Sequence, residues 1–162
     1  ATYVTDLGDS AVTIGGGYTS SDASKTGTAV VNDTAGMHAG ISAVTGDLTV
    51  AIGFADGDSI ESTTASTPAV QVDGEVVKAG VKYVTGDLTF NVGVTSAEGI
   101  DNAFSGTGTT ADAYDKTSAS VSYAVASGVT AILGYSDIES QNEGAADSKD
   151  GSAWFIGANM SF

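Results

Sequence analysis

Apolar residues recur at every second position over most of this chain. The clearest case is the last stretch, where Trp154, Ile156, Ala158, Met160 and Phe162 alternate with residues that are mostly small or polar. Successive side chains of a β-strand point to opposite faces, so a period of two predicts a strand with one apolar face. Helical periodicity is hard to find, and Gly, Thr, Ser and Val favour strands and turns. We therefore predict an all-β fold.

The alternation predicts nine strands, the first a fragment at residues 3–5. The other predicted apolar faces are Val12, Ile14, Gly16 and Tyr18; Met37, Ala39, Ile41 and Ala43; Leu48, Val50, Ile52 and Phe54; Val77, Ala79, Val81 and Tyr83; Leu88, Phe90, Val92 and Val94; Ala119, Val121, Tyr123 and Val125; Val129, Ala131, Leu133 and Tyr135; and the terminal set from Trp154 to Phe162. None of these residues is charged.

The connections between these strands alternate in length. Short turns are predicted at residues 6–9, 45–47, 85–87 and 126–128, where Gly, Asp and Ser fit tight hairpins. Long acidic segments at 20–33, 56–74, 97–115 and 137–151 are predicted to be exposed loops. The sequence Val-Thr-Gly-Asp-Leu-Thr at 44–49 recurs at 84–89, which predicts repeated antiparallel hairpins. The pattern also predicts the same place relative to the short turns for Tyr3, Ala43, Tyr83 and Tyr123.

The face opposite the apolar one carries small and polar side chains, such as Thr13, Ser42, Asn91 and Ser120. Such side chains cannot fill the interior of a small closed barrel, which needs bulky packing. The apolar face is then either the inside of a sandwich or the outside of a transmembrane barrel in lipid. The sandwich alternative is a secreted or surface-layer protein with a structural or adhesive role.

Aromatic placement favours the barrel. A membrane barrel carries aromatic girdles at both interfaces, whereas a sandwich core has no reason to place its aromatics at its rims. Trp154 and Phe162 lie about 27 Å apart along an extended strand, which at a tilt of about 40° spans roughly 21 Å of an apolar band known to be ~25 Å tall. The predicted lipid-interface bands are Tyr3, Tyr83, Tyr123 and Phe162 beside the short turns, and Tyr18, Phe54, Tyr135 and Trp154 toward the long loops.

Charge and composition exclude several classes of protein. The chain of 162 residues has 20 acidic residues against 5 Lys, with no Arg, for a formal net charge of −15. Nucleic-acid binding needs clustered Lys and Arg, so no nucleic-acid partner is expected. The absence of Cys excludes a disulfide scaffold and thiolate metal sites. No stretch approaches the ~18 apolar residues of a membrane helix.

Nearly the whole chain resembles part of an alphaproteobacterial general diffusion porin. The resemblance is carried by the acidic Gly-rich loops, the two Val-Thr-Gly-Asp-Leu-Thr turns and the ending Gly157-Ala158-Asn159-Met160-Ser161-Phe162. It implies a passive channel for ions and small hydrophilic solutes in the outer membrane of a Gram-negative bacterium. It also implies a homotrimer, contact with membrane lipid and lipopolysaccharide, and recognition of the C-terminal strand by the barrel-assembly machinery.

The predicted number of strands departs from that family. With nine strands, the first and the last run in the same direction, and direct closure would pair them in parallel. Bacterial single-chain barrels have even strand numbers and avoid such a pair. We therefore expect residues 1–162 to be one barrel segment, the C-terminal half of a larger barrel, by resemblance one of 16 strands, with Ala1 not the natural start.

Few residues suggest chemistry. The predicted pore-lining residues are His38, Lys78, Lys82, Asn91, Lys116 and Asn159. No catalytic, cofactor or metal site is predicted, although Ca²⁺ or Mg²⁺ could bind loosely at acidic loops carrying Glu98, Asp101, Asp112, Asp137, Glu139, Glu143 and Asp147. Gly57-Asp58-Ser59-Ile60 resembles the nucleophile block of GDSL hydrolases, with a weaker echo at 8–11. That family needs a His near its C-terminus, and no His follows His38.

Overall fold

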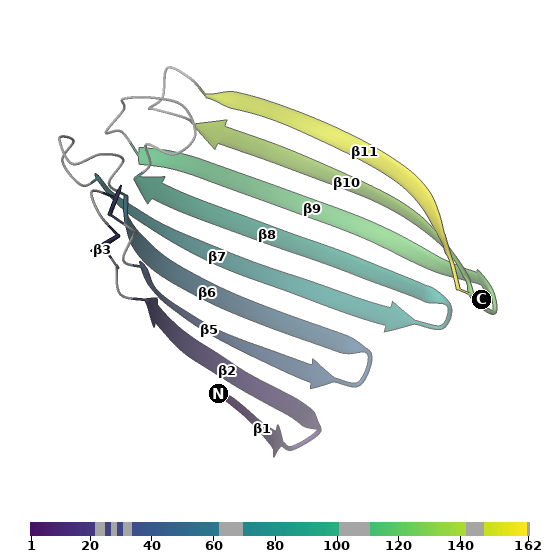
Figure 1. Ribbon diagram of the computed structural model, residues 1–162. Coiled ribbons are helices and arrows are strands. Elements are labelled where there is room, and N and C mark those ends of the chain that lie inside the picture. Colours follow the sequence, from purple (N-terminus) through teal and green to yellow (C-terminus); the bar gives the residue numbers. More distant parts are fainter. Residues whose placement is uncertain are drawn as a thin grey trace.

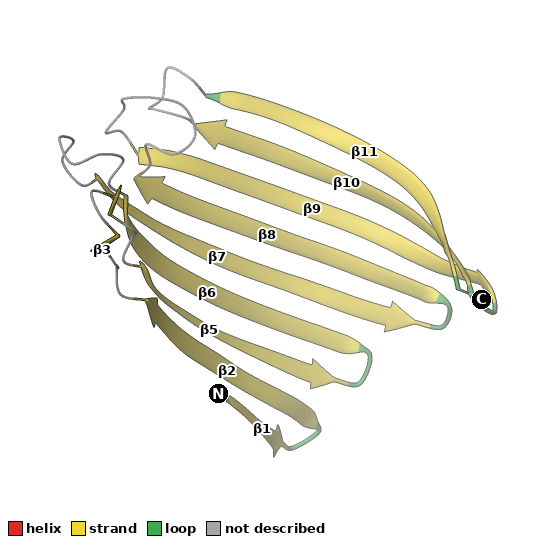
Figure 2. Cartoon of the chain, viewed as in Figure 1, coloured by secondary structure: helices red, strands yellow, loops and turns green. Residues whose placement is uncertain are grey.

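A single antiparallel sheet of nine strands makes up most of the molecule (Figure 1). The computed structural model describes residues 1–21, 25–26, 29–30, 34–61, 70–100, 111–141 and 148–161, in which strands alternate with turns and no helix occurs (Figure 2). The sheet contains, in spatial order, β1 (Thr2–Leu7), β2 (Ser10–Ser21), β5 (Thr34–Thr45), β6 (Leu48–Glu61), β7 (Val70–Thr85), β8 (Leu88–Ile100), β9 (Ala111–Ala126), β10 (Val129–Gln141) and β11 (Lys149–Met160).

The nine predicted strands are confirmed as a meander, because strands that follow one another along the chain lie side by side throughout the sheet. The prediction missed one element, a small separate hairpin of β3 (Lys25–Thr26) and β4 (Ala29–Val30). Both short strands lie within the segment that was predicted to be a loop. No helix that could cross a membrane occurs in the described residues.

Glycines in a left-handed conformation form the four short turns. Gly8, Gly46, Gly86 and Gly128 have φ angles of 64°, 54°, 56° and 75°. Only glycine adopts these angles at no steric cost, and two-residue hairpin turns require them. Each turn occupies only two residues between paired strands, for example Gly46 and Asp47 between Thr45 and Leu48. The four predicted turn positions are therefore confirmed.

One predicted equivalence before the turns is wrong. Tyr83 and Tyr123 take part in the third register pair counted from their turns, with Phe90 and Ala131. Tyr3 takes part in the fifth pair from its turn, with Ile14. The cause is the length of β1, since the segment predicted as a turn from residue 6 still pairs up to Leu7. Tyr3 therefore lies deeper in the apolar face than predicted.

The long connections are shorter than predicted. β6 and β7 pair as far as Glu61 and Val70, and β9 pairs with β10 as far as Gln141. These strand ends are rich in acidic and small residues, which the prediction interpreted as loop. A backbone ladder between strands does not require apolar side chains, so pairing continues beyond the apolar band. The connections that remain lie outside the described residues, as does Phe162.

The apolar face of the sheet is uncovered. Val92, Leu133 and Ile156 expose 53%, 45% and 86% of their surface, and Val12 is the one buried hydrophobic residue among those described. The accessible surface is 10755 Å², against about 7,400 Å² expected for a compact protein of this mass. The predicted sandwich alternative is therefore wrong for the described residues, because these contain no second sheet large enough to cover the apolar face.

The sheet is curved, with the short turns at one end and the strand ends that precede or follow the long connections at the other (Figure 1). A hollow on its polar face is lined by residues from seven strands, β1, β2 and β5 through to β9, whereas a hollow on its apolar face is lined from four, so the polar face is the concave one. Both edge strands, β1 and β11, run toward the short-turn end, as predicted. Neither of their outer edges pairs with another described strand.

Candidate functional site

The concave face has a floor of glycine and small polar residues. Gly15, Gly40 and Gly53 lie side by side on β2, β5 and β6 in one cross-strand row. The same row continues through Lys78, Thr95 and Lys116 on β7, β8 and β9. Three neighbouring positions of the row therefore carry no side chain, and the next three include two long cationic ones.

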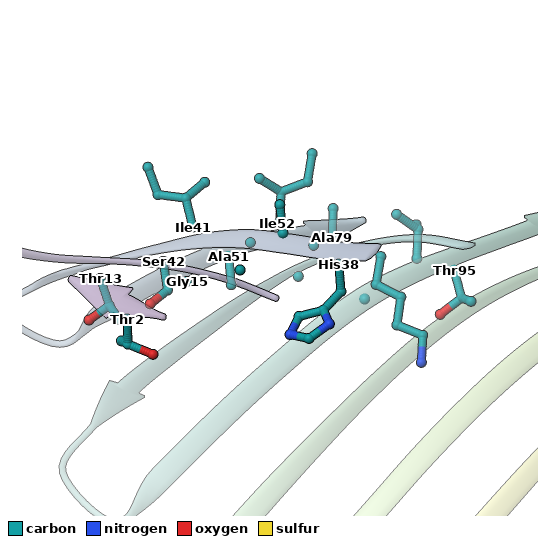
Figure 3. Close-up of a pocket in the computed structure, with 18 of the residues that line it drawn as sticks. Thr2, Thr13, Gly15, His38, Ile41, Ser42, Ala51, Ile52, Ala79 and Thr95 are labelled. Carbon is teal, nitrogen blue, oxygen red and sulfur yellow. The ribbon is translucent and has the colours of Figure 1, made fainter. Parts of the chain in front are cut away.

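This floor forms two adjoining hollows that share Ala51, Gly80, Gly93 and Ser118. The larger has a volume of about 760 Å³. Figure 3 shows that Thr13, Ser42, His38 and Thr95 extend to one side of the sheet, while Ile41 and Ile52 extend to the other. His38 and Lys78 line the larger hollow, and Lys82, Asn91 and Lys116 line the smaller one.

Five of the six residues predicted to line a pore are thus brought together. The exception is Asn159, which lies on the same face of β11 near the short-turn end and lines neither hollow. Asn91 donates a hydrogen bond of 3.4 Å from Nδ2 to Oγ of Ser120, and Ser118 Oγ donates one of the same length to the carbonyl of Gly93. These bonds fix polar groups of β8 and β9 against each other on the concave face.

Charges are separated between the two faces. Successive residues of a strand point to opposite faces, and the described lysine side chains, Lys78, Lys82, Lys116 and Lys149, all belong to the concave set. Most strand carboxylates belong to the apolar set, beyond its band at the long-connection end: Asp56, Glu75, Glu98, Asp115, Asp137, Glu139 and Asp150. Among the strand carboxylates whose side chains are described, Asp6 and Asp112 are the exceptions, and both belong to the concave set.

Two rings on the concave face each cover a glycine of the neighbouring strand. His38 pairs with Gly17, where an added Cβ would lie 2.6 Å from the ring atom Cε1. Phe155 lies in the same way over Gly134, which is buried. The prediction of His38 as a lining residue did not include this packing role. Phe155 was missed, and its one signal was a bulky side chain on the otherwise small face of the last strand.

The outer boundary of the apolar face toward the long connections is aromatic. Tyr135 and Trp154 are cross-strand partners, with ring centroids 4.7 Å apart and planes tilted by 50°. The hydroxyl of Tyr135 donates a hydrogen bond of 3.1 Å to Oδ2 of Asp137. Tyr18 and Phe54 occupy the same boundary on β2 and β6, since the next residues of that face are Ser20 and Asp56.

The acidic residues and the hydrolase-like segment in the described part of the chain are distributed over several strands. No group of three or more His, Asp or Glu side chains there could hold a metal ion. Of the predicted cation-binding acids, Asp101, Glu143 and Asp147 lie outside the described residues. The segment 57–60 that resembles a hydrolase motif lies within β6, paired along its length with β7, and Gly8-Asp9 forms a hairpin turn.

Two solved structures share this arrangement of strands, one an outer-membrane protein and the other a porin. OmpT of Vibrio cholerae, described as outer-membrane expressed, matches with a TM-score of 0.65 and 15% identity over 98% of this chain and 54% of that one. A porin refined at 1.8 Å resolution matches with a TM-score of 0.62 and 19% identity over 99% of this chain and 50% of that one.

The chain therefore spans about half the length of both structures. No family model matches the sequence, and no curated protein matches it. At these identities the likeness concerns the fold, which is that of an outer-membrane β-barrel.

Proposed function

We propose that this chain forms part of the wall of a water-filled porin barrel in the outer membrane of a Gram-negative bacterium. The channel allows passive diffusion of ions and small hydrophilic solutes and carries out no enzymatic reaction. The observation that carries the proposal is the contrast between the faces of one curved sheet. The convex face is apolar and uncovered, and the concave face is lined by glycine, hydroxyl groups and lysine.

Lipid is the partner that fits the convex face. In water, the exposed surfaces of Ile52, Val92 and Ile156 would favour aggregation, since soluble monomers rarely expose apolar patches above a few hundred Å². In a bilayer the same surface contacts hydrocarbon, and every backbone group within the membrane is satisfied by a neighbouring strand. The aromatic boundary at Tyr135 and Trp154 then lies at the headgroup level, where aromatic girdles occur.

Strand direction supports a larger barrel. β1 and β11 run the same way, so their direct pairing would be parallel in an otherwise antiparallel sheet. Two copies of the sheet standing side by side in the same orientation would meet with the same parallel pairing. Closure by an odd number of additional antiparallel strands removes the problem. We therefore propose that this segment belongs to a barrel about twice its size, of 16 strands, which agrees with its coverage of about half of both similar structures.

The remaining partners follow from the same proposal. The acidic end of the convex face lies at the level of lipopolysaccharide headgroups, where Ca²⁺ or Mg²⁺ can bridge carboxylates and phosphates loosely. Assembly as a homotrimer and recognition of the last strand by the barrel-assembly machinery complete the proposal, and no cofactor is required.

A reconstitution experiment tests this function. We expect the full-length protein to require detergent, to migrate differently on gels before and after boiling, and to produce stepwise conductance in planar bilayers. Swelling of vesicles that contain the protein should fall as the radius of an uncharged sugar increases, because a passive pore excludes solutes by size. A protein that remains monomeric in buffer without detergent and gives no conductance would contradict the proposal.

A further inference from the structure

We propose that the concave wall attracts small anions, and that Lys78, Lys116 and Lys82 form the path along which they pass. The inference rests on the proposed channel and concerns which solutes it favours. It is not what the net charge of −15 would suggest, since a strongly acidic protein is expected to attract cations. A solute in the channel meets the charges of the concave face, however, and not the net charge of the whole chain.

The lysines are arranged to act on one solute. Lys78 and Lys116 occupy the same cross-strand row and flank the hydroxyl of Thr95 on the strand between them. Their backbones are separated by two strand spacings, about 10 Å, so both flexible stems reach the space over Thr95. Lys82 lies four residues further along β7 on the same face, about 13 Å nearer the short turns. An anion leaving the first pair therefore meets a further positive charge along the wall.

The carboxylates on the strands that carry these lysines lie on the other face of the sheet or four residues away. On β7 and β9, Glu75 and Asp115 belong to the convex set, separated from the concave wall by the sheet itself. The concave carboxylate of β9, Asp112, lies four residues from Lys116 toward the long connections. The glycines at 80 and 93 add no bulk over the wall between Lys78 and Lys82, so a hydrated ion can approach both.

The selection is by charge rather than by shape. A lysine ammonium acts as a compact point charge, unlike the planar fork of arginine, which matches carboxylate and phosphate geometry. The sequence contains no arginine. The wall therefore favours chloride, small carboxylates and phosphate alike, as rings and patches of charge do in other pores.

Reversal potentials in planar bilayers under a potassium chloride gradient test the inference with the full-length protein. Replacing both Lys78→Glu and Lys116→Glu should lower the ratio of chloride to potassium permeability about three- to fivefold. The milder pair Lys78→Gln and Lys116→Gln should shift it in the same direction by less. The shift should shrink between 0.1 M and 1 M salt, since the screening length falls from about 10 Å to about 3 Å.

Glu75→Lys is the control, because it reverses a single charge on the same strand as Lys78 but on the convex face. It should leave the permeability ratio unchanged. An unchanged ratio in both lysine variants, or an equal shift in Glu75→Lys, would overturn the inference while the channel itself stands. Absence of any conductance in the unaltered protein would overturn the channel as well.

Discussion

The ring of Phe155 covers Gly134, its cross-strand partner on β10, and closes it off from the concave space. A Cβ at residue 134 would overlap the ring, so Gly134→Ala should force Phe155 out of its place. We expect a loss of about 1–3 kcal/mol in the free energy of unfolding, as for other overpacked sites. Urea titration of the protein in lipid vesicles, followed by the fluorescence of Trp154, measures it.

The control is Gly157→Ala, on the concave face of β11, where an added Cβ meets nothing within 4 Å. It should be neutral or slightly stabilising, because alanine restricts the unfolded chain more than glycine. In a Phe155→Ala background, the cost of Gly134→Ala should disappear, since the two residues act on one space. A cost that persists in that background would show that the ring is not its cause.

Two adjacent residues of β8 lie on opposite faces of the sheet and allow the two faces to be compared directly. Val92 lies on the convex face, 53% exposed, while Asn91 lies on the concave face and bonds to Ser120. Val92→Arg places a charge in hydrocarbon and should cost about 2–4 kcal/mol, as at the middle of other membrane barrels. Asn91→Arg keeps its charge in water and should cost only about 1–2 kcal/mol, from its lost hydrogen bond and from the like charge of its cross-strand partner Lys82. Urea titration in vesicles compares them, and equal costs would contradict the assignment of the faces.

The alternation of side chains was sufficient to predict all nine strands, their order and their faces. A period of two is a local property: it can be recognised in the sequence around Val50 or Val92 without knowing which strands lie beside them. The prediction assigned the strand ends to loops, because acidic residues such as Asp56 and Glu98 are typical of loops. They nevertheless pair, and the ladder that holds them involves backbone atoms alone.

The pairs of rings and glycines could not be predicted, for a different reason. His38 opposes Gly17 and Phe155 opposes Gly134 only because of the register between two strands. Register depends on the length of the connection between two strands, and an error of one residue moves a side chain to the other face. The misplaced Tyr3 shows the same limit, since the first turn proved shorter than its composition suggested.

The repeated turns make a matched pair for measuring backbone strain. Gly46 and Gly86 have φ angles of 54° and 56°, and a side chain at either would meet nothing within 4 Å. Replacement by Val should therefore cost only the left-handed conformation, about 1–2 kcal/mol, and replacement by Asn should cost less, because Asn tolerates this region. Unfolding titrations of the four variants measure these costs. The same substitution should lower the free energy of unfolding by a similar amount at both turns. A difference between the turns larger than about 1–2 kcal/mol would show that the repeat does not form equivalent hairpins.

Trp154 reports which medium contacts the convex face. Its side chain is 72% exposed, and beyond it the same face of β11 continues with Ser152 and Asp150. Trp154 should therefore lie near the level of the headgroups. We expect its fluorescence to be quenched strongly by lipids that carry a nitroxide close to the headgroup, more weakly by a nitroxide near the chain end, and little by aqueous iodide.

Exchanging two adjacent residues gives the control. In the double variant Trp154→Phe and Phe155→Trp, the tryptophan moves to the concave face, where the ring at 155 is 51% exposed beside Gly134. Because that face contacts water in the proposed channel, the quenching should reverse: iodide becomes effective, and lipid nitroxides lose their effect. If iodide instead quenches Trp154 and lipid nitroxides do not, the convex face contacts water, and the barrel proposed for this chain is wrong.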